Sequence, residues 1–346
     1  MRFAFTEDQV AFRDAVRDAL AKEAGPDHLR AAWDAPTAQP SGDRKVWSTL
    51  AHMGVLGLTV PEAYGGMGMN ELDLVLLLEE TGRVALPEPI VETVAVAAPL
   101  LADIGSPELQ AEWLPRIASG DAVVSVGFGA PPFLVALDVA DLLLLEREGR
   151  LLAIRGEDLT GELAPVRQAS VDGARRLFAQ HPSSSTTIAE GPGAMIAASA
   201  AFDRGALGTA AQLLGLAQHL LDVTVDYVKQ REQFGVPIGS FQAIKHHLAD
   251  ALLQLEFARP VVYRAAYSMA LGLDTRSRDV SMAKCYASDA ATFVTRQALQ
   301  CHGAIAYTVE YDAHLWMKRV WALAASWGDS AFHRERVALS VLGPRS

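Results

Sequence analysis

From residue 194 onward the sequence is dominated by long alanine-rich stretches in which apolar residues recur every three or four positions. One such face carries Leu213, Leu216, Leu220, Val223 and Tyr227. This spacing predicts amphipathic helices, and residues 244–255, 283–299 and 315–325 repeat it. Long amphipathic helices with short connections bury their apolar faces against one another. This part of the chain is therefore predicted to be a four-helix bundle.

The N-terminal third is predicted to be helical as well. Thr6 and Gln9 have the spacing of a capping box, and apolar residues then recur every four positions up to Leu20. Helical patterning returns over residues 71–84 and 91–104. These segments predict several helices that pack on one another.

Between these regions the pattern changes to short runs rich in valine and leucine. Residues 122–128, 141–145 and 151–154 are apolar and short, as expected of buried strands. Residues 147–149 (Arg-Glu-Gly) separate the last two runs as a hairpin turn would. The sequence therefore predicts a small antiparallel β domain over residues 121–193.

The chain length of 346 residues suggests about two domains, and the patterning divides them into three parts. These are an N-terminal helical domain (1–120), a reduced middle β domain (121–193) and a C-terminal helical bundle (194–346). The predicted fold class is α+β, with mostly α structure.

Charge and composition exclude several classes of function. There are 30 Lys and Arg against 41 Asp and Glu, a net charge of −11. Binding to nucleic acid or to an anionic membrane needs a basic surface, so neither partner is expected. Two cysteines are too few for a disulfide framework or a four-thiolate zinc site, and no metal is expected. Because no apolar run reaches membrane-spanning length and the start is acidic, we expect a cytoplasmic protein.

Residues 231–242 form the stretch most specific for chemistry. Arg231 lies beside Gln233 and Gly235, and Gln242 follows. A guanidinium binds phosphate through two hydrogen bonds, and glycine lets the backbone approach an anion. The same residues also suit a plain helix C-terminus, where glycine caps and arginine favours the dipole. The residues alone leave both alternatives open.

A second stretch begins at Gln300. Gly303 and Ala304 are small and leave room for a ligand close to the main chain, although two helices crossing closely would need the same small residues. His302 has no second histidine or cysteine at ligand spacing on its helix, so we predict a hydrogen-bonded core histidine.

Taken together, these stretches resemble the acyl-CoA dehydrogenase family over nearly the whole chain. Residues 61–66 (Pro-Glu-Ala-Tyr-Gly-Gly) resemble the family's N-terminal loop, and Phe202 with Asp203 resembles the Phe-Asp pair of its long C-terminal helix. Residues 231–242 are similar to the Arg-x-x-Phe-Gly…Phe-Gln signature, and residues 300–307 to the Gln-x-His-Gly-Gly-x-Gly turn. Both the order and the spacing agree.

The resemblance implies a helical domain, a middle β domain and a four-helix bundle. It also implies FAD as cofactor and oxidation of an acyl-CoA thioester to the 2-enoyl-CoA. A carboxylate removes the α-proton while the β-hydrogen leaves as hydride to the flavin, and electrons then pass to an electron-transfer flavoprotein. FAD would lie at a subunit interface of a homo- or hetero-oligomer.

By this resemblance the cofactor surface has two parts. The part that contacts the diphosphate region of a neighbouring subunit's FAD comprises Arg231, Gln233, Phe234 and Gln242. The part that approaches the adenosine diphosphate portion comprises Gln300, Gly303 and Ala304.

The sequence departs from the family at the catalytic base. The family's glutamate usually lies in a Tyr-Glu-Gly-Thr turn, but residues 326–329 read Ser-Trp-Gly-Asp, which puts Trp327 at its position. Other members carry the base at the start of the long helix, where this chain has Gly205. The nearest carboxylates belong to Asp203 and Asp329. Asp329 is the candidate base, with a helix N-cap as its alternative role.

The strand that holds the flavin ring in the family is also altered. Residues 123–133 carry a single hydroxyl, Ser125, as the candidate ring contact, and Pro131 and Pro132 lack N–H donors. Some actinobacterial members pair a chain that carries the base with a degenerate chain that completes the FAD surface. Three hypotheses follow: a self-sufficient dehydrogenase, a non-catalytic partner subunit of a dehydrogenase, and a flavin-free helical interaction protein. For the dehydrogenase hypotheses we expect a role in the degradation of a fatty acid or a sterol side chain.

Overall fold

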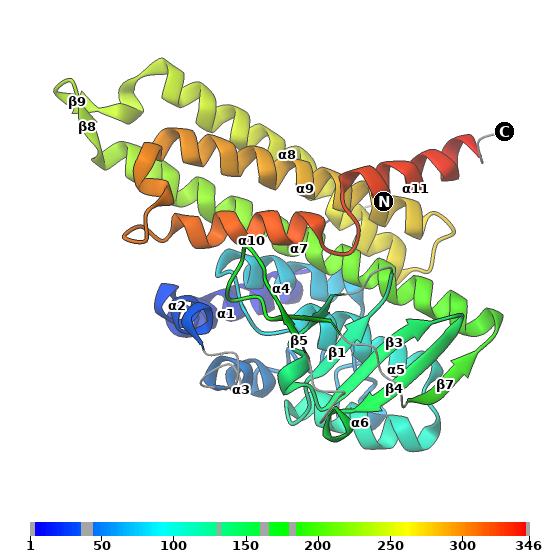
Figure 1. The fold of residues 1–346 in the computed structure, drawn as a ribbon. Coiled ribbons are helices and arrows are strands. Elements are labelled where there is room, and N and C mark those ends of the chain that lie inside the picture. Colours follow the sequence, from blue (N-terminus) through cyan, green and yellow to red (C-terminus); the bar gives the residue numbers. More distant parts are fainter. Residues whose placement is uncertain (1–3, 36–43, 130–132, 160–165, 180–184, 344–346) are drawn as a thin grey trace.

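The computed structural model describes residues 4–35, 44–129, 133–159, 166–179 and 185–343. Long C-terminal helices form one layer across the top of Figure 1, and the N-terminal helices and the β sheets lie beneath them. Helix α7 contacts the helices of both layers as well as strands β4 and β7. The mostly helical α+β class is confirmed.

The N-terminal part is helical, as predicted. Its elements are α1 (Glu7–Glu23), α2 (Pro26–Asp34), α3 (Lys45–His52), α4 (Glu71–Arg83), the π-helix η2 (Val91–Ala97), α5 (Ala98–Ile104) and α6 (Pro107–Ser119). The capping box is present: the Gln9 backbone N–H donates to Thr6 Oγ1 at 3.2 Å, and the Thr6 N–H donates to Gln9 Oε1 at 2.9 Å. The single helix predicted over residues 91–104 begins instead with a π-helical segment.

The middle of the chain forms two small sheets. One contains β1 (Val124–Gly127), β3 (Leu142–Arg147), β4 (Arg150–Arg155) and β7 (Thr186–Glu190) in the order β1-β3-β4-β7. The other contains β2 (Leu134–Val135), β5 (Val166–Gln168) and β6 (Leu177–Ala179) in the order β2-β6-β5. The pairings are antiparallel except that of β1 with β3, which is parallel.

The predicted hairpin joins β3 to β4. Arg147 pairs with Arg150, and the two residues between them, Glu148 and Gly149, have φ angles of 53° and 76°. Positive φ at both positions is the property of the turn whose twist matches its flanking strands. Glu146 adds a hydrogen bond, because its carboxylate accepts from the Gly149 N–H at 3.0 Å.

The C-terminal bundle places four chain segments at one end. It contains α7 (Pro192–Gln230), α8 (Gln242–Ala270), α9 (Arg276–His302), α10 (Ala313–Ala325) and α11 (Ser330–Leu342), with the hairpin of β8 (Glu232–Gln233) and β9 (Val236–Pro237) after α7. Short connections make successive helices antiparallel. The end of α7, the start of α8, the end of α9 and the start of α10 therefore share one end of the bundle (Figure 1).

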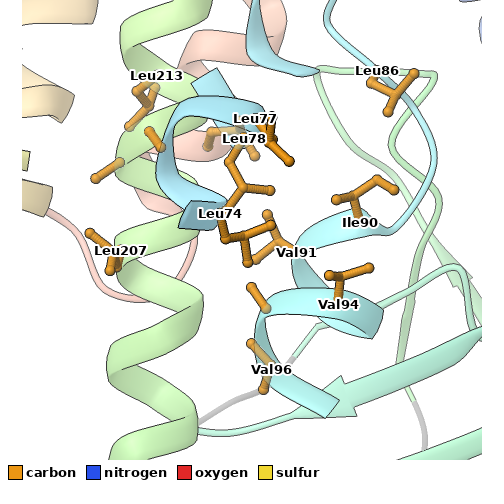
Figure 2. Packing of buried hydrophobic residues seen from close by; sticks show 14 of the residues in the cluster. Leu74, Leu77, Leu78, Leu86, Ile90, Val91, Val94, Val96, Leu207 and Leu213 are labelled. Atoms are coloured by element: carbon orange, nitrogen blue, oxygen red, sulfur yellow. The ribbon is translucent and has the colours of Figure 1, made fainter. Parts of the chain in front are cut away.

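A continuous hydrophobic core joins the bundle to the N-terminal helices. Figure 2 shows leucines of α4, valines of η2 and leucines of α7 meeting there: Leu74, Leu77, Leu78, Val91, Val94, Leu207 and Leu213. Two glycines let α4 and α7 approach to backbone contact. A Cβ at Gly215 would lie 1.9 Å from the Glu79 carbonyl oxygen, and one at Gly82 would lie 2.1 Å from that of Gln212.

We expect Gly215→Ala to lower the free energy of unfolding by about 3 kcal/mol, because both nearest atoms belong to the backbone and cannot move aside cheaply. Urea denaturation of the purified chain measures this. Gly193→Ala is the matched control, since Gly193 lies in the first turn of the same helix with no heavy atom within 4 Å of its added Cβ. Equal stabilities of the two variants would contradict the close approach of α4 and α7.

Candidate functional site

The first group of predicted cofactor residues surrounds the end of α7. Arg231 caps the helix, with its backbone N–H donating to the Tyr227 carbonyl at 2.8 Å. Gln233 lies in β8, Phe234 stands at the hairpin tip with 94% of its surface exposed, and Gln242 begins α8. All four side chains are exposed. Among the described residues, no carboxylate lies within ion-pair distance of the Arg231 guanidinium.

The second group lies at the end of α9, and an aromatic contact joins it to the first. His302 is buried between the Ala298 carbonyl (Nδ1, 2.8 Å) and the Tyr311 hydroxyl (Nε2, 3.0 Å), which confirms a core histidine. Its ring stacks on Tyr227 with centroids 4.4 Å apart. Because Tyr227 lies one turn before Arg231 and His302 directly precedes Gly303, this stack holds the two predicted loops at the same end of the bundle.

The residues that follow His302 are open to solvent. Gln300, Gly303 and Ala304 are exposed, and a Cβ at Gly303 would have no heavy atom within 4 Å. Gly303 has a φ of 68°, the left-handed conformation that glycine adopts without strain. An exposed guanidinium, exposed amides and an open glycine backbone are donors of the kind that a diphosphate accepts.

The two alternative positions of the catalytic base meet at one place in the structure. A Cβ on the buried Gly205 would lie 2.5 Å from ring atoms of Trp327, so the indole rests directly on the glycine. The Phe202 ring stands edge-on to the indole, with centroids 5.9 Å apart. The two positions at which the resemblance places the glutamate are thus in contact with each other, and they hold an indole and a glycine.

The turn that carries Trp327 is strained. Trp327 has a φ of 55° and Gly328 a φ of 85°, and a left-handed conformation is unfavourable for a bulky side chain. His333 contacts the Trp327 carbonyl through Nε2 at 2.8 Å, and burial lowers the pKa of this histidine to about 4, which keeps it neutral.

A lysine that the sequence reasoning missed lies behind this turn. Lys284 of α9 has 0% of its surface exposed, and its Nζ donates to the carbonyls of Ala324 (3.1 Å) and Gly328 (3.0 Å) and to Ser288 Oγ (3.1 Å). Burial lowers the pKa of Lys284 to about 7. In the sequence, the sign of its burial is that Lys284 occupies one of the apolar positions of the helix predicted over residues 283–299.

The two nearby aspartates are engaged elsewhere. Asp329 is exposed, and its Oδ1 accepts from the Phe332 backbone N–H at 2.8 Å as the N-cap of α11. Its carboxylate borders a shallow groove of about 330 Å³ formed by Ser288, Thr292, Trp321, Ala324, Ala325, Asp329, Ser330 and Ala331, a set without any residue of α7. Asp203 is buried and accepts from Arg336 Nη2 at 2.9 Å and from the Ser277 hydroxyl.

The predicted ring contact is also engaged. Ser125 is fully buried in β1, and its hydroxyl donates to the Val135 carbonyl at 2.8 Å. The Thr93 hydroxyl of η2 bonds the backbone of neighbouring Val124 at 3.1 Å. Pro131 and Pro132, which the sequence placed in the same segment, lie outside the described residues.

The predicted diphosphate surface and the base position lie far apart within one chain. Gly205 lies in α7 and Arg231 caps it, 26 residues later. At 1.5 Å per residue this separation is about 39 Å. The two parts therefore lie toward opposite ends of the bundle.

Helices packed on helices, a small β region and exposed loops at one end of the bundle define a mostly helical α+β fold. Residues 6–121 match the acyl-CoA dehydrogenase N-terminal domain, and residues 191–342 match the acyl-CoA dehydrogenase C-terminal domain. The chain belongs to the acyl-CoA dehydrogenase family, whose members normally bind FAD.

Relatives and solved structures agree with this assignment. The acyl-CoA dehydrogenase IpdE2 of Mycolicibacterium smegmatis is 33% identical over 317 residues, which cover 91% of this chain and 92% of that protein. A chain of the steroid ACAD Tcur3481–Tcur3483 (G363A variant) is 26% identical, with a TM-score of 0.86 over 96% of this chain and 97% of that chain. One chain of the ChsE4–ChsE5 complex of Mycobacterium tuberculosis shares the fold at 24% identity, with a TM-score of 0.86 over 100% of this chain and 100% of that chain. Among the described residues, no helix combines the length and apolar character that crossing a membrane requires.

Proposed function

We propose that this chain takes part in FAD-dependent α,β-dehydrogenation of an acyl-CoA thioester, as a subunit that supplies cofactor surface and leaves the catalytic base to a partner chain. In this reaction a base takes the α-proton and the β-hydrogen leaves as hydride, which gives the 2-enoyl-CoA. FAD, when bound, supplies the two-electron acceptor, and an electron-transfer flavoprotein is the proposed next carrier.

The contact of Trp327 with Gly205 is the observation that carries the proposal. An indole has only a donor N–H and cannot accept a proton at neutral pH, and glycine has no side chain. Asp203 is committed to Arg336, and Asp329 caps α11 beside a groove that α7 does not line. On this geometry a self-sufficient enzyme with Asp329 as base is the weaker candidate.

The exposed end of the bundle supports a cofactor site shared between chains. Arg231 lies about 39 Å along α7 from Gly205, farther than one flavin dinucleotide reaches, so a flavin held there would need its ring site from another chain. Phe234 in the hairpin after α7, and Tyr307 and Val309 in the segment after α9, expose 94%, 67% and 71% of their surfaces. Exposed apolar side chains at this end of the bundle are available for contact with a partner chain.

We propose a second acyl-CoA dehydrogenase chain as the partner, in a hetero-oligomer. The similarity to a chain of Tcur3481–Tcur3483, a steroid ACAD whose name joins two proteins, supports this arrangement. It also supports a bulky acyl-CoA, such as a steroid-derived one, as the substrate.

Purification with and without a partner chain tests the proposal. The chain alone is expected to be colourless, whereas co-expression with a family member that carries glutamate in its Tyr-Glu-Gly-Thr turn should give a yellow complex that bleaches anaerobically with acyl-CoA. A yellow chain that bleaches by itself would support the self-sufficient enzyme. Absence of flavin with every such partner would support the flavin-free interaction protein.

A further inference from the structure

The turn at residues 326–328 is held from two sides by buried groups. On one side, Lys284 Nζ donates to the carbonyls of Ala324 and Gly328. Ala324 lies in the last turn of α10, where carbonyls have no partner within their own helix. Lys284 therefore satisfies a carbonyl at the end of α10 with one hydrogen bond and fixes the residue after Trp327 with another.

On the other side, the start of α11 closes over the turn. His333 Nε2 contacts the Trp327 carbonyl at 2.8 Å, and a Cβ at Gly328 would lie 2.4 Å from the Phe332 ring. Only glycine fits between these groups at a φ of 85°. A strained backbone persists when its surroundings over-determine it, and here α9 and α11 both do so.

We propose that Lys284 is a positioning residue: it holds the Trp327 turn so that the indole stays seated on Gly205. The role rests on the proposed function, because this contact occupies the two positions at which the resemblance places a catalytic base. Lys284 touches neither the indole nor Gly205 in any described hydrogen bond and acts through the Gly328 and Ala324 carbonyls.

The role does not depend on the charge of the lysine. A protonated amine has three donors and serves both carbonyls and Ser288. A neutral amine keeps two hydrogens for the carbonyls, and its lone pair accepts a hydrogen bond from the Ser288 hydroxyl instead. Both forms hold the turn.

Fluorine NMR of the isolated chain labelled with 5-fluorotryptophan tests the position of the indole. The chain has 6 tryptophans, and Trp327→Phe identifies the resonance of Trp327 by its disappearance. In Lys284→Met this resonance is expected to move or split while the other five stay in place. Gly205→Ala, which pushes the indole from the opposite side, should move the same resonance.

Lys229→Met is the control, because Lys229 is exposed on α7 and contacts only Asp226, at 3.6 Å, among the described carboxylates. A folded Lys284→Met chain with an unmoved Trp327 resonance would overturn the proposal. If Lys284→Met does not fold, Lys284→Gln replaces it: the glutamine amide nitrogen is one bond shorter and does not reach both carbonyls, so the Trp327 resonance is still expected to move, and an unmoved resonance overturns the proposal. Because this readout needs no flavin or partner, it can fail or succeed independently of the proposed function.

Discussion

Arg231→Ala in this chain is expected to lower the FAD content of the co-expressed complex at least tenfold. The guanidinium is exposed at the end of α7 and pairs with no described carboxylate, so it is available to a diphosphate. A hydrogen bond to a charged group contributes about 1.5–3 kcal/mol, and each 1.4 kcal/mol is a factor of ten in affinity. The ratio of flavin to protein after dialysis measures the effect.

Two variants make this result specific. Arg231→Lys keeps the charge but loses the two-pronged geometry, so we expect an intermediate loss of FAD. Lys229→Ala removes an exposed cation two residues earlier and should leave FAD content unchanged. An Arg231→Ala complex that keeps its flavin would show that this loop is only a helix terminus.

We expect the free energy of unfolding of the wild-type chain, compared with that of Lys284→Met, to rise by ~5 kcal/mol between pH 7 and pH 10.5. One pKa unit of difference between the folded and unfolded chains corresponds to about 1.4 kcal/mol. The pKa of Lys284 is about 7 in the folded chain and 10.5 when unperturbed. Between these values the unfolded chain binds a proton that the folded chain does not. The stability of the wild-type chain therefore decreases as the pH falls from 10.5 to 7. Below pH 7 the difference in stability between the two chains stays constant.

Urea unfolding of both chains across pH 6 to 10.5 measures this difference. Burial is the main cause of the lowered pKa of Lys284. The charged or titratable groups around its amine are Asp329, Arg175, Cys285, Asp289 and His333. These groups are present in both chains and largely cancel in the comparison. Parallel stability curves for the two chains would show that the lysine is charged when buried.

Local patterns predicted much of the fold. The helical period of the apolar residues predicted the bundle. Thr6 and Gln9 predicted the start of α1, and residues 147–149 predicted the β3–β4 hairpin. The parallel pairing of β1 with β3 was missed because it depends on the path of the chain between the strands. The π-helical segment was missed because residues 91–97 are buried on every side, which leaves no face to reveal the period.

The candidate site also contains residues that the sequence predicts and residues that only the packing reveals. Exposed glycines and amides near Arg231 and Gly303 are visible in sequence because they interrupt helical patterns. Trp327 and Gly205 lie 122 residues apart, and only the packing of α7 against the turn after α10 brings them together. The buried position of Lys284 was hidden because a lysine in a helix is ordinarily solvated.

The central claim is that this chain does not supply the catalytic base, and Asp329→Asn tests it most directly. Asparagine caps a helix as well as aspartate does, so α11 stays folded while the carboxylate is lost. We predict that the co-expressed complex carrying this variant bleaches with acyl-CoA under anaerobic conditions at the wild-type rate. A fall of about 10²–10⁴-fold, the contribution of a general base, would contradict the account.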